Sequence, residues 1–357
     1  MLHPARISSS IFEKRSRGGT DLKTRLEEIL EALVADRGVA GVAVAVRGEA
    51  QPEAVWAPSP DQEEPAFLAY SITKTFTAVL FLLLQEEGRL TLDDSLARWF
   101  PRITGAEQIS LRHLLNHTAG IPDYGGLRAY HEAVRSSPET PWSFERFAAE
   151  TFDQGLSFPP GAGWAYSNPG YMLLKKIAEE VAGASSANLI SDRIARPLGL
   201  RRTSVPESVE DLSPLAPASS RALALDGTLR DVRRHYHPGW VSHGVVASTP
   251  SEIVCFLDAL SSGRLVSRPS LEEMIELVSV PGPAAQPWGK PSYGLGVMAD
   301  PASPWGLVWG HNGGGPGYSA SAFHAPALQG ATVCAMVALD EGFQAEEVVF
   351  AVLDALA

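Results

Sequence analysis

The sequence predicts a mixed α/β protein in which one sheet is assembled from both ends of the chain and a mostly helical subdomain is inserted between them. Two observations predict this arrangement. Short β-branched and alanine-rich runs occur before residue 70 and return after residue 281, whereas residues 71–280 are mostly helical with long loops marked by proline and glycine. With 357 residues and 45% hydrophobic content, the chain can also bury a large core.

The N-terminal part divides into an extension and the first sheet elements. Residues 1–19 carry scattered basic residues and serines but no continuous apolar run, so we expect a disordered extension and, without a recognisable signal peptide, a cytoplasmic protein. Apolar residues at helical spacing predict an amphipathic helix over Asp21–Asp36. Strand-like runs follow, and residues 20–70 are therefore expected to belong to the sheet domain; the runs cover residues 39–46, 53–56 and 65–70.

The middle and C-terminal parts complete this organisation. The apolar run Ala78–Leu84 is too short to cross a membrane and predicts a core helix, and a second helix is expected over Met172–Val181. Strand patterns then return, followed by a helix with one apolar face; the strands are expected over 293–299, 306–311, 319–325 and 331–339, and the helix over Gln344–Leu356. The predicted sheet domain is thus discontinuous, with residues 20–70 and 281–357, and the helical domain comprises residues 71–280.

Composition and spacing exclude several functions. The net charge of −12, without a basic cluster, disfavours nucleic acid and anionic membranes as partners. Cys255 and Cys334 lie in apolar runs and are expected to be free core residues. His113 and His117 have the spacing of helix-borne zinc ligands, but no glutamate accompanies them, so we expect structural roles. No G-x-S-x-G, P-loop or complete dinucleotide motif is present, and we expect neither a cofactor nor a metal.

The first candidate for catalysis is Ser71-Ile72-Thr73-Lys74 at the start of the apolar helix. Positions i and i+3 share a helix face, so the Lys74 amine can lie against the Ser71 hydroxyl as a proton acceptor or electrostatic partner. A serine in the first turn would also have free backbone N–H groups nearby for an oxyanion. The alternative is a solvated lysine at the start of a core helix.

A second candidate is Tyr166-Ser167-Asn168, flanked by proline and glycine in a tight loop before a helix. A phenol near a cationic lysine can be held partly as phenolate, so Tyr166 could act as a general base. The alternative is a packed loop tyrosine with Asn168 as a helix cap.

The third candidate is His311-Asn312-Gly313-Gly314-Gly315-Pro316-Gly317, directly after a strand-like run. Consecutive glycines allow a substrate to approach the backbone closely, and an unperturbed histidine titrates near pH ~6.5. We therefore expect His311 to change charge within the working pH range. The alternative is a flexible hairpin turn.

These three motifs, in this order, resemble those of the serine β-lactamase and penicillin-binding family, in the branch that holds class C β-lactamases, D-alanyl-D-alanine carboxypeptidases and related serine esterases. The similarity begins near residue 20 and includes framing segments; these are Gly88–Asp94, Leu111–Pro122, Arg196–Leu200 and Tyr293–Gly296. The resemblance implies the β-lactamase/transpeptidase-like fold, with an antiparallel sheet flanked by helices.

The resemblance also implies roles for the motif residues. Ser71 would be the acylated nucleophile, Lys74 and Tyr166 the proton-handling pair, and Asn168 a residue that orients Lys74 and a substrate amide. His311 stands where the family usually has lysine, and if the motifs converge as the resemblance implies, its imidazole would lie close to the Tyr166 hydroxyl. Backbone N–H groups of Ser71 and Gly314 would form the oxyanion hole, in the substrate-binding run with Asn312 and Gly313.

Asn312 and His311 are departures from the family pattern, because they replace a carboxylate-binding hydroxyl and a cationic lysine. The function expected from the resemblance is therefore a serine hydrolase acting on small esters, amides or peptides, most simply an esterase or a D-amino-acid amidase or peptidase. A β-lactamase or D-alanyl-D-alanine carboxypeptidase is the alternative within enzymes. An inactive module that binds peptides or protein partners is the alternative outside them.

Overall fold

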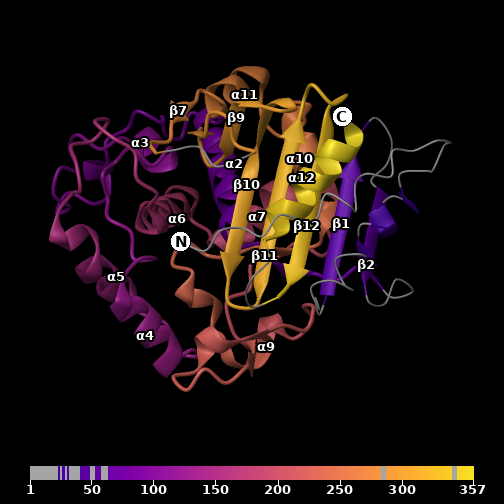
Figure 1. The fold of residues 1–357 in the computed structure, drawn as a ribbon. Helices are drawn as coiled ribbons and strands as arrows, with labels where there is room; N and C mark the ends of the chain where they lie inside the picture. The colour runs from indigo at the N-terminus through magenta and orange to yellow at the C-terminus, as the bar shows by residue number, and fades with distance from the viewer. Residues whose placement is uncertain are drawn as a thin grey trace.

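The computed structural model describes residues 23–24, 26–28, 30–31, 41–48, 53–57, 63–282, 287–339 and 344–357. Its centre is an antiparallel eight-stranded sheet in the order β2-β1-β12-β11-β10-β9-β8-β7 (Figure 1). The strands come from both ends of the chain; their bounds are β1 Gly41–Arg47, β2 Glu53–Ala57, β7 Val278–Ser279, β8 Ser292–Tyr293, β9 Met298–Ser303, β10 Gly306–Gly315, β11 Tyr318–Ala325 and β12 Ala331–Ala338. The predicted α/β fold, with its antiparallel sheet built from both termini, is confirmed.

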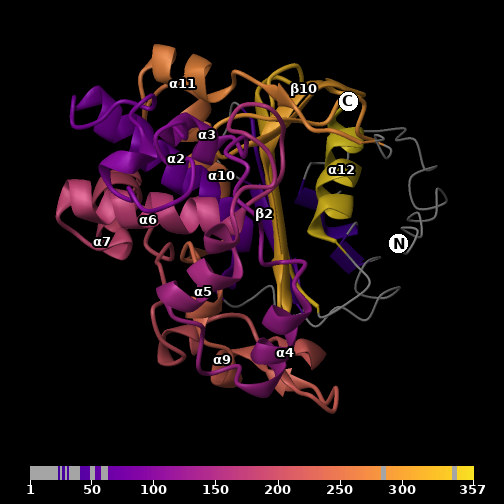
Figure 2. The same cartoon turned by 90° about the vertical axis from the view of Figure 1, so that its left-hand side faces the viewer.

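Helices cover both faces of the sheet. Figure 2 shows the sheet nearly edge-on, with α12 (Ala345–Leu356) on one face and the helical part on the other. The helical part includes α10 (Pro250–Ser261), which packs on β1, β11 and β12. Its other α-helices are α2 Thr73–Glu86, α3 Leu111–Leu115, α4 Arg128–Ser136, α5 Phe144–Glu150, α6 Asn168–Ala182, α7 Ser186–Ile190, α8 Arg196–Leu198, α9 Val232–His235 and α11 Arg268–Met274.

The period-two pattern of β1 explains this three-layer arrangement. Val42, Val44 and Val46 contribute to the core under α12, whereas Ala43 and Ala45 contribute to the larger core on the helical side. Small alanines on the helical side allow α10 to lie close to the sheet. Both faces of the central strands are buried, which is why their sequences read as nearly continuous apolar runs.

Several sequence predictions need correction. The run at 293–299 is not one strand, because Gly294–Val297 form a turn between β8 and β9. The run at 65–70 supplies only β3 (Phe67–Leu68), which pairs with β6 (Ala247–Ser248) outside the large sheet. The remaining short elements are β4 Ser219–Ser220, β5 Arg230–Asp231, and the 3-10 or π turns η2 Tyr70–Ile72, η3 Leu96–Arg98, η4 Phe152–Gln154, η5 Ser191–Ala195, η6 Glu210–Leu212, η7 Arg221–Leu223 and η8 Pro238–Trp240.

Two predictions concern the N-terminal region, of which the structure describes only some residues. Within Asp21–Asp36, residues 23–24, 26–28 and 30–31 are helical, whereas the extension over residues 1–19 lies outside the described residues. The division into a discontinuous sheet domain and an inserted helical domain stays a prediction. Among the described residues, every helix is too short or too polar to cross a lipid bilayer.

The cysteine prediction is confirmed in part. Both cysteines are free thiols, and Cys334 is fully buried in the core. Cys255 is only half-buried and accepts a hydrogen bond from Arg47 at 3.4 Å.

Candidate active site

Ser71 lies in the 3-10 turn η2, which leads directly into the buried helix α2. The preceding residue, Tyr70, has a positive φ of 45°, a strained conformation that is held by its hydroxyl, which donates to Pro316 O at 2.7 Å. This sharp turn holds Ser71 at the mouth of a cavity, partly exposed, while the helix behind it is buried.

Lys74 lies one turn further on and is fully buried. Its Nζ lies 3.2 Å from Ser71 Oγ, 2.8 Å from Asn168 Oδ1 and 2.5 Å from His243 Nε2. Burial lowers the pKa of Lys74 well below its ordinary value, and the charge of Asp123 opposes this shift in part. The structure therefore brings Ser71, Lys74 and Asn168 together, as the sequence predicted, and adds His243.

Asn168 begins helix α6, so the predicted start of this helix at Met172 is wrong. Ser167 caps the helix by accepting from Gly170 N, and Pro169 occupies the first turn, where its missing N–H costs nothing. Asp123 accepts from Asn168 N at 2.8 Å and from Asn168 Nδ2 at 3.4 Å. These contacts turn the amide oxygen of Asn168 toward Lys74.

Tyr166 lies next to Ser71 and near His311 of β10. Its hydroxyl is hydrogen-bonded to the Ser71 side chain, and its ring lies 4.8 Å from Lys74 Nζ. Burial raises the pKa of Tyr166 above its ordinary value, so the side chain is a neutral phenol. The expectation of a partial phenolate is therefore not supported.

His311 lies on β10 and is 2% exposed. Its Nδ1 donates to Asn312 O at 2.5 Å, which leaves Nε2 to accept from the Tyr293 hydroxyl at 2.9 Å. Burial, with the charge of Lys74, lowers the pKa of His311 to about 3. The imidazole is thus neutral at pH 7, and its predicted titration near neutrality is wrong. Its hydrogen-bond partner is Tyr293, whereas its ring centroid lies 6.4 Å from that of Tyr166.

Asn312 and the glycines as far as Gly315 continue β10, and the hairpin turn that was the alternative prediction is confined to Pro316 and Gly317. Asn312 faces away from Ser71, and its Nδ2 donates to Glu346 Oε1 on α12. Gly313 faces η2, where an added Cβ would lie 2.1 Å from Ala69 O, so only glycine permits this approach of the strand. Gly314 lines the cavity beside Ser71. The structure therefore brings Gly313 and Gly314, but not the Asn312 side chain, to Ser71.

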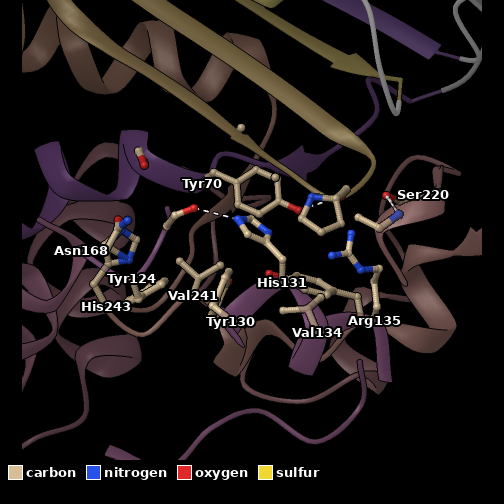
Figure 3. Close-up of a pocket in the computed structure, with 17 residues that line it drawn as sticks. Tyr70, Tyr124, Tyr130, His131, Val134, Arg135, Asn168, Ser220, Val241 and His243 are labelled. Carbon is tan, nitrogen blue, oxygen red and sulfur yellow. Dashed lines mark hydrogen bonds between the residues drawn. The ribbon is translucent and has the colours of Figure 1, made fainter. Parts of the chain in front are cut away.

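The cavity next to Ser71, here called the Ser71 cleft, has a volume of about 380 Å³. Figure 3 shows Asn168 and His243 at one end and Arg135 with Ser220 at the other. Tyr166 does not line this cleft but lines a separate apolar cavity of about 210 Å³ together with Trp164, Trp288 and Tyr293 among others. The Ser71 cleft thus lies beside Ser71, whereas the apolar cavity lies beside Tyr166.

His243 and Asp123 are the residues that sequence reasoning missed. His243 Nδ1 donates to Gly244 O at 2.8 Å, so its Nε2 carries the lone pair that faces Lys74. Burial, with the charge of Lys74, lowers the pKa of His243 well below its ordinary value, which favours the neutral imidazole. Neither residue belongs to a motif. The only signal for His243 is weak, because it is a polar residue next to a glycine before the apolar run 245–247.

His113 and His117, which have the spacing of helix-borne zinc ligands, make structural contacts instead. His113 completes the capping box of α3 with Ser110, and His117 Nδ1 accepts from Ser167 N at 3.2 Å. The described part of the chain holds no group of three or more histidine, cysteine or acidic side chains suited to a metal ion.

Comparison with known proteins places this site in a family. The chain is 31% identical over 266 residues to penicillin-binding protein 4* of Bacillus subtilis, covering 70% of this chain and 55% of that protein. It is 27% identical over 208 residues to the esterase EstB of Burkholderia gladioli, covering 52% of each. The chain spans about half the length of these curated relatives.

Solved structures match over nearly the whole chain. The D-stereospecific amidohydrolase from a Streptomyces species superimposes with a TM-score of 0.80 and 31% identity, covering 93% of this chain and 98% of that one. The family model described as Beta-lactamase matches residues 26–353. The resemblance expected from the motifs is confirmed, and this chain belongs to the Beta-lactamase family.

Proposed function

We propose that this chain is a serine hydrolase that forms an acyl-enzyme on Ser71 and acts on esters or on primary amides such as D-amino-acid amides. The observation that carries the proposal is the placement of Lys74 Nζ between Ser71 Oγ and two hydrogen-bond acceptors, Asn168 Oδ1 and His243 Nε2. The Streptomyces amidohydrolase and the Burkholderia esterase support the two substrate classes.

Lys74 is the proposed general base. A neutral amine has two N–H groups and one lone pair. Asn168 Oδ1 and His243 Nε2 can only accept, so they bind both N–H groups and leave the lone pair for the proton of Ser71 Oγ. Burial of Lys74 favours this neutral form, because the charged form loses its hydration.

Tyr166 is the proposed proton donor to the leaving group. A neutral phenol that is hydrogen-bonded to Ser71 lies where the scissile bond would be, and it can protonate the departing oxygen or nitrogen. Lys74, which received the Ser71 proton, would then return a proton to Tyr166. Backbone N–H groups of Ser71 and Gly314, which both line the cleft, would stabilise the oxyanion. Water would release the acyl group in a second step.

Two features indicate a leaving group without a carboxylate. His311, beyond Tyr166, is neutral where a lysine would be charged. Asn312 turns its amide away from Ser71 to the Glu346 carboxyl, so this amide offers no donor to a substrate anion in the site. An ester or a primary amide has no carboxylate on its leaving group, unlike a penicillin or a peptide with a free C-terminus. The β-lactamase and carboxypeptidase alternatives are therefore less well supported.

Covalent labelling tests this proposal. The wild-type protein and the Ser71→Ala and Ser220→Ala variants would be exposed to a fluorophosphonate and to an activated ester, and intact masses measured. Ser220 is a suitable control because it lines the same cleft. We expect adducts on the wild type and on Ser220→Ala, and none on Ser71→Ala. An adduct that persists on Ser71→Ala would overturn the assignment, and an unlabelled wild type would indicate the inactive binding module.

Turnover would then be measured for three substrate classes, namely p-nitrophenyl esters, D-amino-acid amides and β-lactams. We expect turnover of one or both of the first two. A cytoplasmic location and action on a small molecule remain parts of this proposal.

A further inference from the structure

Arg135 supplies a positive charge to the Ser71 cleft from its far end. It lies on α4, lines the cleft, and extends toward Ser220 in Figure 3. No aspartate or glutamate is among the residues that line this cleft. Within the described ranges, Arg135 has neither an ion pair nor a hydrogen bond, although the chain carries a net charge of −12. An arginine without a counter-ion in a concave site is available for a ligand.

Arg128, seven residues earlier on the same helix, shows the contrast. Its guanidinium pairs with Glu132 at 2.6 Å, and its side chain is 90% exposed. Arg128 therefore has the ordinary role of a surface arginine in an i,i+4 pair. Arg135 differs in that it is half-buried and directed into a cavity that also contains the proposed nucleophile.

The geometry also indicates which half of the substrate Arg135 would contact. Ser71 and Asn168 line the Ser71 cleft, whereas Tyr166 lines the separate apolar cavity. If Tyr166 protonates the leaving group, that group lies on the Tyr166 side. The acyl group, which stays on Ser71, then occupies the cleft that ends at Arg135.

We propose that the Ser71 cleft selects acyl groups that carry a carboxylate at the end remote from the scissile carbonyl, and that Arg135 binds this carboxylate. A guanidinium offers parallel N–H donors that match the two oxygens of a carboxylate, and the partly desolvated cleft strengthens the pair. This specificity rests on the proposed function, because the proposed roles of Ser71 and Tyr166 decide that the acyl group, and not the leaving group, occupies the cleft. The preferred substrates are half-esters or half-amides of dicarboxylic acids, and acyl groups with an acidic terminus.

The kinetic test compares p-nitrophenyl half-esters of glutaric, adipic and suberic acids with the same compounds whose free carboxyl is methylated. We expect the wild type to prefer at least one anionic ester over its neutral partner by about tenfold or more in kcat/KM. Arg135→Gln should lose about 10- to 100-fold on the anionic ester and change little on the neutral one. Arg135→Lys should retain part of the preference, and Arg128→Gln should behave as wild type.

A binding measurement separates this proposal from the assignment of the nucleophile. Suberamic acid has an amide at one end and a carboxylate at the other, and suberamide is its neutral partner. In the Ser71→Ala protein, we expect suberamic acid to bind more tightly than suberamide, with a Kd that weakens about tenfold when Arg135→Gln is added.

Equal binding of the two compounds, or equal losses on charged and neutral esters in Arg135→Gln, would overturn the role of Arg135. Failure of the proposed function would look different, because Ser71→Ala would still release p-nitrophenol while the binding preference persisted.

Discussion

Lys74 Nζ lies 2.5 Å from His243 Nε2 in the buried centre of the site, although 169 positions separate the two residues along the chain. Gly244 O fixes the imidazole so that its lone pair faces the amine. His243 therefore accepts from Lys74 and helps to set the direction in which the amine presents its remaining lone pair to Ser71. It is a positioning residue, because it acts through Lys74.

Replacement of His243 should reduce catalysis in a graded way. We expect His243→Ala to lower kcat/KM for a p-nitrophenyl ester by about 10- to 100-fold, because Lys74 loses an acceptor and gains rotational freedom. His243→Gln should retain more activity, since its amide oxygen can accept. His131→Ala is the control, because His131 lines the same cleft but bonds to Gly125 O. Activity in His243→Ala equal to that of the wild type would contradict this role, provided that Tm shows an intact fold.

The pH dependence should report Lys74. Its pKa is lowered well below 10.5 by burial, so kcat/KM should rise with pH and level off before an ordinary lysine would lose its proton. Asp123 raises the pKa of Lys74 by its charge, so Asp123→Asn should move this limb to lower pH. Asn168→Asp places a new carboxylate beside the ammonium and should move the limb to higher pH, lowering activity at neutrality.

The measurement is the pH profile of kcat/KM for one ester in the three proteins. Apparent values belong to the coupled group of Lys74, His243 and Tyr166, so the direction of each shift is the test. Three profiles that differ only by a constant factor would show that Lys74 is not the titrating base. No limb near neutrality is expected from His311, because its pKa is about 3.

Local periodicity predicted the parts of the site that depend on neighbouring residues. Ser71 and Lys74 come together because a turn of helix separates them, and strands β10 to β12 were recognisable as short apolar runs. The true start of α6 was also readable, since Ser167 and Pro169 are a cap and a first-turn proline.

Long-range packing decided what the sequence could not predict. Burial of His311 beneath the rest of the site, which removes its charge, depends on the surrounding tertiary structure. The same burial means that a lysine at position 311 would have to lose its hydration. Strand alternation predicts that the side chains of Asn312 and His311 point to opposite faces of the sheet. It could not identify the hydrogen-bond partner of Asn312, because Glu346 lies 34 positions away.

Gly313 should be essential for the approach of β10 to the nucleophile. In Gly313→Ala, the new Cβ would lie 2.1 Å from Ala69 O and 3.1 Å from Ser71 N, so the strand and η2 must separate. We expect a loss of about 1–3 kcal/mol in the free energy of unfolding and a fall in kcat of about 100-fold or more. Gly314→Ala is the control for stability, because its Cβ would meet no atom within 4 Å. Matching Tm values for the two variants would contradict this account.

The final prediction concerns the charge beside the leaving group. A penicillin or cephalosporin carries its carboxylate on the ring next to the leaving nitrogen, where this site offers a neutral His311 and no Asn312 amide, and the Glu346 carboxyl adds negative charge on the α12 side of β10. Short-chain p-nitrophenyl esters should therefore have a higher kcat/KM than nitrocefin. Burial raises the pKa of Glu346, and its hydrogen bond from Asn312 opposes this shift, so the repulsion should be strongest at alkaline pH.

Glu346→Gln removes this charge and retains a group that can accept from Asn312. We expect it to raise the ratio of nitrocefin to ester turnover about two- to tenfold, mostly through KM, while activity on the ester stays near that of the wild type. Glu347→Gln, at the next position of the same helix and bonded to Gln344 N in place of Asn312, is the matched control. Nitrocefin turned over faster than the ester by the wild type, or a ratio unchanged in Glu346→Gln, would show that charge near Asn312 does not select the leaving group.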